Sequence, residues 1–292
     1  MSDSVKQNVQ WFPGHMAKTR RLIKESLPLV DAVTEIVDAR MPISSRNPEL
    51  REIIGNKPLI ILLNKCDVAD PKATEEWIAY FKSKGDSCLA VDCKSGNGLK
   101  NYAPLLRTVL KDRIAANEAK GMKGKPLRIM VVGIPNTGKS SFINKMAGRN
   151  RAKVADKAGV TRQNQWFVID NGIELLDTPG VLWPKFDDPK VGDRLAFIGS
   201  VKDEVFDNET LAVRLIEVLK NGYADRLTER YKITDFEDCE AWEILELIGK
   251  KRGMMMRGGE VDTLRASVML LDEYRAGKLG KLTLDSIGEL NG

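Results

Sequence analysis

One segment of the sequence has the residue types that bind phosphate groups: Gly133-Ile134-Pro135-Asn136-Thr137-Gly138-Lys139-Ser140. It fits the pattern G-x-x-x-x-G-K-[ST], in which glycines let backbone N–H groups approach phosphates and the following helix N-terminus stabilises their charge. Lys139 would then reach the β- and γ-phosphates, and the Ser140 hydroxyl would bind Mg²⁺. The predicted phosphate-binding residues are Asn136, Thr137, Gly138, Lys139, Ser140, Ser141 and Gly180.

A second motif, Asp177-Thr178-Pro179-Gly180, follows the apolar run of residues 173–176. An aspartate at a strand end can hold the hydration shell of Mg²⁺, and a glycine just after it can offer its N–H to the γ-phosphate. The same residue types also make ordinary turns. The position downstream of a phosphate loop favours the nucleotide role.

The segment Asn64-Lys65-Cys66-Asp67 ends an apolar run and could read a guanine base. A carboxylate at Asp67 can accept hydrogen bonds from N1–H and the exocyclic amine of guanine, and leaving such an acceptor unpaired costs about 1–3 kcal/mol. Adenine offers no such pair of donors, so Asp67 disfavours an ATPase. Seen alone, the tetrapeptide is equally compatible with a polar strand end. The segment 92–96 would place backbone N–H groups near the guanine oxygen. The predicted guanine-binding residues are Asn64, Lys65, Cys66, Asp67, Asp92, Cys93 and Lys94.

The elements that must position these residues are predicted by the spacing of apolar side chains. Strand-length apolar runs alternate with amphipathic helical patterns through residues 33–177, which is typical of an α/β fold with a mostly parallel sheet and helices on both faces. The predicted strands are 33–38, 59–64, 87–92, 127–132 and 173–177. The predicted helices are 48–54, 73–84, 99–116 and 139–147.

Beyond residue 207 the strand signal ends, and residues 211–220, 242–248 and 261–274 show helical spacing. We therefore predict a nucleotide-binding domain over residues 1–185, a linker or hinge over 186–206, and a small all-helical domain over 207–292. Loss of a γ-phosphate contact at Gly180 would relax a loop that leads directly into the linker. We expect the bound nucleotide to set the angle between the two domains.

The net charge of +5 is unevenly distributed. Residues 1–205 carry 33 Lys and Arg against 24 Asp and Glu (+9), whereas residues 206–292 carry 13 against 17 (−4). Such a basic excess can bind nucleic-acid phosphates, and it is equally compatible with a solvated helix face. A basic stripe over residues 107–128 contains Arg107, Lys111, Arg113, Lys120, Lys123, Lys125 and Arg128.

Composition disfavours several classes of protein. No apolar run approaches the roughly 20 residues of a membrane span, and the N-terminus lacks the apolar core of a secretory signal. We therefore expect a cytoplasmic protein without a membrane partner, and we expect no DNA partner. The single histidine, His15, excludes a multi-histidine metal site. Neither zinc nor disulfides are expected, because the cysteines are scattered: Cys66, Cys88, Cys93 and Cys239.

Together the motifs resemble those of Ras-like GTPases, but in a changed order. The guanine-reading segments precede the phosphate loop, as in the circularly permuted GTPases; a doubly wound domain tolerates this because its termini lie at the surface. The resemblance identifies Thr161 with the switch threonine that caps Mg²⁺, so the implied metal ligands are Ser140, Thr161 and Asp177. With the segment Trp11-Phe12-Pro13-Gly14-His15-Met16 included, residues 9–284 resemble the bacterial ribosome biogenesis GTPase A family.

This resemblance implies binding of GTP and GDP, hydrolysis of GTP with Mg²⁺, and a late role in assembly of the large (50S) ribosomal subunit through contact with rRNA. The basic stripe and the cluster Lys250, Lys251, Arg252 and Arg257 are the expected rRNA contacts. Two alternatives stay open. One is a GTP-gated RNA-binding scaffold in which hydrolysis only resets binding. The other is a GTPase subunit of a tRNA-modifying complex, which would be expected to keep the usual motif order.

The residue that orients the attacking water is not supplied by the motifs. Many Ras-like GTPases have a glutamine directly after D-x-x-G, where this chain has Val181. The family resemblance points instead to His15, whose ordinary pKa of about 6.5 would leave it largely neutral and able to accept a proton or a hydrogen bond. A histidine beside Trp11 and Phe12 is also compatible with simple packing.

Asn136 is a second candidate for a catalytic role. An asparagine at this position of a G-x-P-N-x-G-K-S loop resembles the ligand that holds K⁺ beside the β- and γ-phosphates in some GTPases. A cation there would neutralise charge in the transition state. The alternative is an asparagine that stabilises its own loop through backbone bonds.

Overall fold

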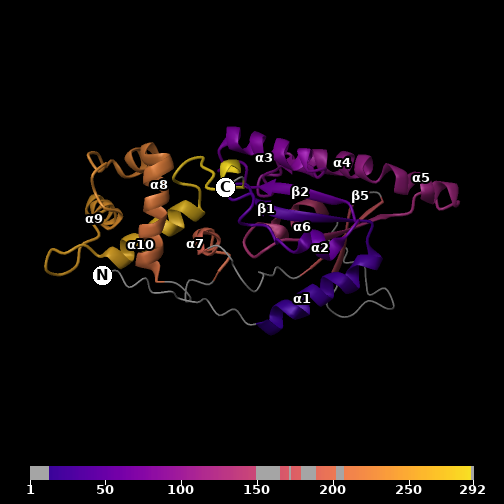
Figure 1. The fold of residues 1–292 in the computed structure, drawn as a ribbon, viewed down its shortest axis with the longest axis horizontal. Coiled ribbons are helices and arrows are strands. Elements are labelled where there is room, and N and C mark those ends of the chain that lie inside the picture. The colour runs from indigo at the N-terminus through magenta and orange to yellow at the C-terminus, as the bar shows by residue number, and fades with distance from the viewer. Residues whose placement is uncertain (1–12, 149–164, 171, 179–188, 202–206, 291–292) are drawn as a thin grey trace.

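The computed structural model of the protein describes residues 13–148, 165–170, 172–178, 189–201 and 207–290. The molecule is elongated, with a sheet and its helices at one end and a group of helices at the other (Figure 1). Among the described helices, none combines the length and the apolar character needed to cross a membrane.

Six described strands form one sheet in the order β3-β2-β1-β4-β6-β5. All neighbours are parallel except β5, which runs antiparallel to β6. Four of the predicted strands are confirmed to within one residue, whereas β3 ends two residues before its predicted end. The strands are β1 (Ala32–Asp38), β2 (Leu59–Asn64), β3 (Ser87–Ala90), β4 (Leu127–Val132), β5 (Gln165–Asp170) and β6 (Ile173–Asp177).

The strand β5 was not predicted. The sequence Asn171-Gly172 between two apolar runs is a strong hairpin signal that could have indicated it. Because the other five strands are parallel, their carboxyl ends meet at one edge of the sheet. Asp38, Asn64 and Asp177 lie at these ends. We call this side the carboxyl edge and the opposite side the amino edge.

Helices cover both faces of the sheet, as predicted. On one face Ile61 and Leu63 of β2 pack with Trp77 and Phe81 of α3. On the other face the alternate residues of β2 pack with a cluster that contains Tyr102 of α4. Strands buried on both faces read as continuous apolar runs, which explains why the sequence predicted them well. The helices of this part are α1 (Pro13–Ser26), α2 (Leu50–Ile54), α3 (Pro71–Ser83), α4 (Tyr102–Val109), α5 (Lys111–Ala119) and α6 (Lys139–Ala147), with short 3₁₀ turns η1 (Leu27–Leu29) and η2 (Leu99–Asn101).

The single helix predicted over residues 99–116 is wrong. The chain forms η2, α4 and α5 in succession, and the backbone leaves helical geometry at Leu110 (φ −101°, ψ 16°). Leu110 is buried at this break. Apolar spacing therefore continues across the break, and the sequence pattern does not report it.

The four described α-helices after the sheet share one apolar core. α8 and α9 contain the predicted segments 211–220 and 242–248, and α10 begins two residues after the start of the predicted segment 261–274. The longest, α8, has a break at Tyr223 (φ −147°). α7 lies within the predicted linker, and its buried Leu195 and Phe197 belong to the same core. These helices are α7 (Pro189–Phe197), α8 (Asn208–Tyr231), α9 (Ala241–Lys251) and α10 (Thr263–Arg275), followed by a 3₁₀ turn η4 (Ile287–Leu290).

After α10 the chain returns to the sheet and connects the helical part of the molecule to it. The Leu284 N–H donates to the Arg40 carbonyl at 2.7 Å. The buried Asp285 carboxylate accepts from the Ile43 and Ser44 N–H groups at 2.7 and 2.8 Å, and it pairs with Arg194 of α7 at 3.0 Å. The helical part is thus connected to the carboxyl edge through the C-terminal tail as well as through α7.

Candidate nucleotide site

The predicted phosphate loop joins β4 to α6 and lies at the carboxyl edge. Its shape requires glycine at two positions. A Cβ on Gly133 would lie 2.9 Å from the Ile36 carbonyl oxygen, and Gly138 has φ +99° with the Asn64 amide nitrogen only 2.1 Å from where a Cβ would stand. Asn136 also has a positive φ of 63°. The loop therefore packs too closely against β1 and β2 for side chains at Gly133 and Gly138.

Asn64 links the predicted phosphate loop to the two predicted guanine-reading segments. Its Nδ2 donates to the Thr137 carbonyl at 2.7 Å, and its Oδ1 accepts from the Cys93 N–H at 2.9 Å. The side chain is buried. Segments that are 73 and 29 residues from Asn64 in the sequence are thus joined by one carboxamide.

Lys65 links the phosphate loop to a buried ion pair. Its Nζ donates to the Asn136 carbonyl at 2.7 Å and lies 3.0 Å from the Asp38 carboxylate. Asp38 also accepts from Arg40 Nε at 3.0 Å and Nη2 at 2.9 Å. Arg40 in turn donates to the Tyr274 carbonyl of α10 at 2.7 Å and lies 4.8 Å from the centroid of that ring.

Asp38 and Arg40 were not predicted as site residues. Both are fully buried. Burial alone would raise the pKa of the Asp38 carboxyl, but the charges of Arg40 and Lys65 outweigh it and hold that pKa well below its usual range. The sequence places an Asp and an Arg two residues apart directly after an apolar run, but this pattern specifies neither their burial nor their partners.

Asp67, the predicted base reader, is exposed and makes no hydrogen bond within the described part of the chain. The neighbouring Cys66 is half-buried, and burial raises the pKa of its thiol. The Asp67 carboxylate is therefore available to accept bonds from a ligand, as guanine recognition requires.

The backbone N–H groups of the segment 92–96 form hydrogen bonds within the protein. The N–H groups of Lys94 and Ser95 donate to the Asp92 carboxylate at 2.8 and 3.2 Å, and that of Cys93 donates to Asn64. Partial burial acts to raise the pKa of Asp92, but hydrogen bonds from Ser95 and Lys94 lower it. Three consecutive N–H groups are thus engaged within the protein, and their approach to a guanine oxygen stays a prediction.

Lys139 and Asp177 meet at the mouth of the phosphate loop as an ion pair. Thr178 anchors the strand end by donating to the Val131 carbonyl at 2.6 Å. Oxygen donors suit Mg²⁺, and the Asp177 carboxylate and the exposed Ser140 hydroxyl supply them here. Within the described residues no group of three or more His, Cys, Asp or Glu side chains could hold a metal. A cation at this point would therefore need further ligands, which phosphate oxygens and water provide.

Three predicted site residues fall outside what the structure describes. Thr161 and Gly180 lie in undescribed segments. His15 belongs to α1, but its side chain is not described.

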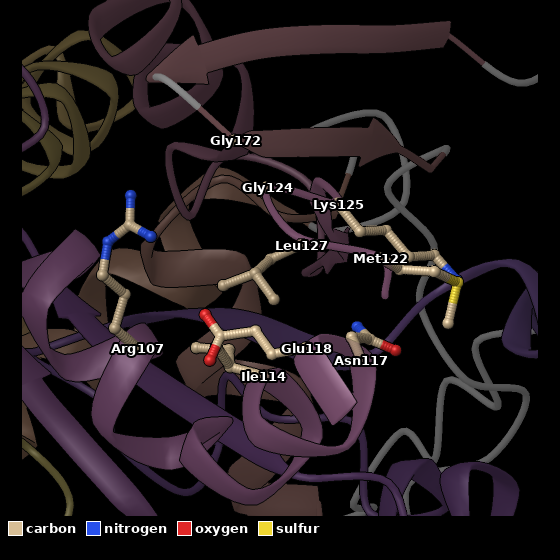
Figure 2. A pocket seen from close by; sticks show the side chains of 9 residues that line it. All are labelled: Arg107, Ile114, Asn117, Glu118, Met122, Gly124, Lys125, Leu127 and Gly172. Atoms are coloured by element: carbon tan, nitrogen blue, oxygen red, sulfur yellow. The ribbon is translucent and has the colours of Figure 1, made fainter. Parts of the chain in front are cut away.

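A separate cavity of about 410 Å³ lies at the amino edge, far from these motifs. It is formed by the last turn of α5, the connector before β4 and the turn before β6. Figure 2 shows Arg107 and Lys125 on opposite sides of it, with Ile114 and Leu127 between them. The cavity shares no residue with the nucleotide motifs.

The basic stripe at this edge is only partly free. Arg113 pairs with Asp31 at 3.0 Å, and Arg128 pairs with Glu174 at 3.0 Å while lying over the Trp166 ring. The four lysines of the stripe are exposed: Lys111, Lys120, Lys123 and Lys125.

The loop between β4 and α6, its hydrogen bonds to the segment 64–67 and an aspartate at the end of β6 are typical of a P-loop GTPase, and the order of the motifs is that of a circularly permuted one. The family model described as 50S ribosome-binding GTPase matches residues 128–240. That range begins at β4 and does not include the base-reading segment 64–67.

Known relatives specify the class further. The chain is 45% identical over 278 residues to ribosome biogenesis GTPase A of Bacillus cereus, covering 95% of this chain and 94% of the relative. It is 32% identical over 277 residues to the Thermotoga maritima protein of the same name, covering 95% and 94%. The solved structure of GDP-bound YlqF from that organism superposes with a TM-score of 0.67 at 29% identity, covering 92% of this chain and 100% of that one. The GNP-bound form gives 0.65 at 30% identity, covering 92% and 97%.

The chain belongs to the ribosome biogenesis GTPase A family. It is accordingly a GTPase, an enzyme that binds GTP and GDP and hydrolyses GTP.

Proposed function

We propose that this GTPase promotes a late step in assembly of the large (50S) ribosomal subunit, that it contacts rRNA, and that the subunit stimulates its hydrolysis of GTP. The observation that carries the proposal is the similarity along nearly the whole chain to relatives named for ribosome biogenesis. Work on a ribosomal subunit would place the protein in the cytoplasm.

In this proposal the residues at the carboxyl edge take the roles that their geometry allows. Asp67 reads guanine from an exposed position, while Asn64 and Lys65 hold the base-reading segment against the phosphate loop. Lys139 would exchange its contact with Asp177 for the β- and γ-phosphates. Asp177 and Ser140 would then be free to hold Mg²⁺, with Thr161 as a third ligand. The cation, when bound, neutralises charge on the phosphates.

Hydrolysis requires a group that orients water, and we assign this role to His15. Helix α1 carries His15 and packs against the sheet through the buried Ile23. A neutral imidazole can accept a hydrogen bond from water at neutral pH.

A K⁺ ion beside the phosphates, with Asn136 as a ligand, would add a further positive charge in the transition state. In the structure the Asn136 Nδ2 donates to the Gly199 carbonyl. Its Oδ1 is the atom that could bind a cation.

The rRNA contacts we propose lie at opposite ends of the molecule. The exposed lysines of the stripe belong to α5 and the connector after it, whereas Lys250, Lys251 and Arg257 lie on or after α9. α5 and α9 are at the two ends of the long axis (Figure 1). The two basic groups would therefore contact separate rRNA segments or one extended segment. Arg252 contributes less, because it already lies over Tyr231 and near Glu273.

We also propose that the parts 1–185 and 207–292 act as two domains whose relative angle depends on the nucleotide. Small-angle scattering with GDP and with a non-hydrolysable GTP analogue tests this, alone and on the subunit. If the scattering profiles with GDP and with the analogue superimpose, both for the free protein and on the subunit, the proposed change of angle between the domains is wrong.

The decisive experiment measures GTP turnover with and without purified large subunit, in K⁺ and in Na⁺, for the wild type and for His15→Ala. We expect the subunit to raise turnover, K⁺ to exceed Na⁺, and His15→Ala to lose most of the stimulated rate while GTP affinity stays nearly unchanged. An unaltered single-turnover rate would exclude His15 from the mechanism. Equal rates in both salts would exclude the K⁺ role.

A variant that binds GTP but cannot hydrolyse it distinguishes the scaffold alternative from a role that requires hydrolysis. If hydrolysis only resets binding, subunits supplied with this variant in stoichiometric amount should still complete maturation. If hydrolysis drives the step, they should accumulate as the immature particle.

A further inference from the structure

The end of α7 touches the phosphate loop directly. The side chain of Asn136 donates to the Gly199 carbonyl, and the Ser200 hydroxyl donates to the Pro135 carbonyl at 2.6 Å. Two consecutive residues of the loop are therefore held by two consecutive residues that follow α7.

Residues 199–200 have a fixed conformation of their own. Gly199 has φ +69°, its N–H donates to the Ala196 carbonyl at 2.9 Å, and the Ser200 N–H donates to the Leu195 carbonyl at 2.9 Å. These bonds close the last turn of α7. The contact with the phosphate loop is thus made by the C-terminal cap of α7.

Arg275, the last residue of α10, supports this cap from behind. Its Nε donates to the Phe197 carbonyl at 3.2 Å and its Nη2 to the Ala196 carbonyl at 3.0 Å. A Cβ on Gly199 would lie 3.3 Å from Arg275 Nε and 3.4 Å from Asn136 Nδ2. Gly199 therefore lies in close contact with both Arg275 and Asn136, and its positive φ favours glycine at this position.

The phosphate loop is held on its other side by Lys65, which donates to the Asn136 carbonyl at 2.7 Å. Asn136 thus uses its backbone oxygen toward the sheet and its side-chain nitrogen toward the helical part. Because Nδ2 is committed to Gly199, the orientation of the carboxamide is set by α7.

We infer that Ser200 and Arg275 are positioning residues of the nucleotide site, through which the helical part of the chain fixes the phosphate loop. Ser200 acts on Pro135, and Arg275 acts through Gly199 on Asn136. By linkage, a nucleotide that tightens the loop must also tighten the α7 cap. This inference goes beyond the proposed role in ribosome assembly and rests only on nucleotide binding.

The test uses the full chain with a fluorescent GDP analogue, without ribosomal subunits. Ser200→Ala and Arg275→Ala are each expected to speed GDP release by about 3-fold to 10-fold. Ser200→Ala loses one neutral hydrogen bond to the loop, and Arg275→Ala loses two charge-assisted ones that act on the loop only through the α7 cap. Arg275→Lys, which keeps a donor, is expected to restore part of the effect. Arg265→Ala is the matched control, since Arg265 is exposed on the same helix, and it is expected to release GDP at the wild-type rate.

Hydrogen exchange supplies a readout that a purely structural role would not move. In the wild type, GDP is expected to slow exchange of the amides of Gly199 and Ser200. In Arg275→Ala this GDP-dependent slowing should shrink, whereas loss of fold stability alone would raise exchange equally with and without GDP. The inference would be overturned if both alanine variants released GDP at the wild-type rate. It would also be overturned if GDP did not change hydrogen exchange at residues 199–200 of the wild type. If Arg275→Ala does not fold, Ser200→Ala still decides the release test.

Discussion

The carboxyl and amino edges of the sheet carry polar residues of similar types but use them differently. At the carboxyl edge Asp38, Asn64 and Lys65 are bound to other loops and are buried or half-buried. At the amino edge the lysines of the stripe are exposed, and Arg113 pairs with Asp31 near the surface. One edge has a single rigid arrangement, and the other presents charge to solvent.

This difference fits two kinds of binding, one to a small ligand at a preformed site and one to a polyanion at a charged surface. A site that must hold phosphates and a base within bonding distance needs side chains whose positions are set before the ligand arrives. A surface that attracts a polyanion needs charge and little geometry, because counterion release supplies the affinity. Substitutions of the buried residues at the carboxyl edge should therefore change stability, and substitution of its exposed Asp67 should change nucleotide choice. Substitutions at the amino edge should change mainly salt-dependent binding.

The largest effect is expected for Arg40→Leu. It leaves the buried Asp38 carboxylate with Lys65 as its remaining charged partner, and breaking a buried pair costs about 3–5 kcal/mol. Urea unfolding followed by circular dichroism measures this loss. A decrease in the free energy of unfolding below about 1 kcal/mol would mean that the pair contributes no more than a surface ion pair. The proposed difference between the two edges of the sheet would then be wrong.

The contribution of the same Asp38–Arg40 pair to stability should depend on pH. Because Arg40 and Lys65 lower the pKa of Asp38 in the folded state, its contribution to stability is fully present above the unfolded value of about 3.9 and is lost as pH falls through the folded pKa. We expect Asp38→Asn to be less stable than the wild type at neutral pH and to lose less stability on further acidification. Unfolding curves from pH 7 to pH 3 compare the two. Parallel pH profiles would contradict this account.

At the base-reading segment, Asp67→Asn should weaken GDP binding by about 1–3 kcal/mol, since an amide cannot accept both guanine donors. Thermal stability should stay near that of the wild type, because Asp67 is exposed. Calorimetric titration with GDP and with XDP sharpens the assignment: the variant should gain relative affinity for the xanthine base. Equal loss for both nucleotides would place Asp67 outside the base contact.

Replacing Lys120, Lys123 and Lys125 together by alanine should leave GDP affinity and folding unchanged. The slope of log K against log salt for binding to the large subunit should fall by roughly 2 to 3, about 0.7–0.9 for each phosphate that a lysine no longer neutralises. The control is the triple variant at Lys72, Lys82 and Lys84, whose residues are exposed on or beside α3. An equal change of slope in the control would show that net charge, rather than this edge, is responsible.

The smallest effect is expected for Arg113→Ala. Its side chain is 53% exposed in its pair with Asp31, and such pairs contribute at most about 1 kcal/mol. Unfolding in low and high salt measures the difference, which should vanish as salt rises. A loss comparable to that of Arg40→Leu would remove the distinction between the two edges.

Much of the site followed from local patterns. Gly133 and Gly138 are required where a loop approaches strands too closely for a Cβ, and their spacing around Lys139 already predicted the phosphate loop. The parallel strands were equally readable, because burial on both faces leaves only apolar residues in them. The break at Leu110 escaped prediction because the buried leucine keeps the apolar spacing intact.

The sequence by itself determined the nucleotide motifs and their permuted order, because each motif is a short run of residues whose chemistry is local. Only the tertiary structure decided what holds the motifs in place. Lys65 and Arg40 meet at Asp38, and Arg40 also donates to the Tyr274 carbonyl, 234 residues away. Arg275 donates to the Phe197 carbonyl, 78 residues away, beside the Gly199 that contacts the phosphate loop. Contacts at such separations depend on how the parts of the chain pack together, and no local pattern carries that information.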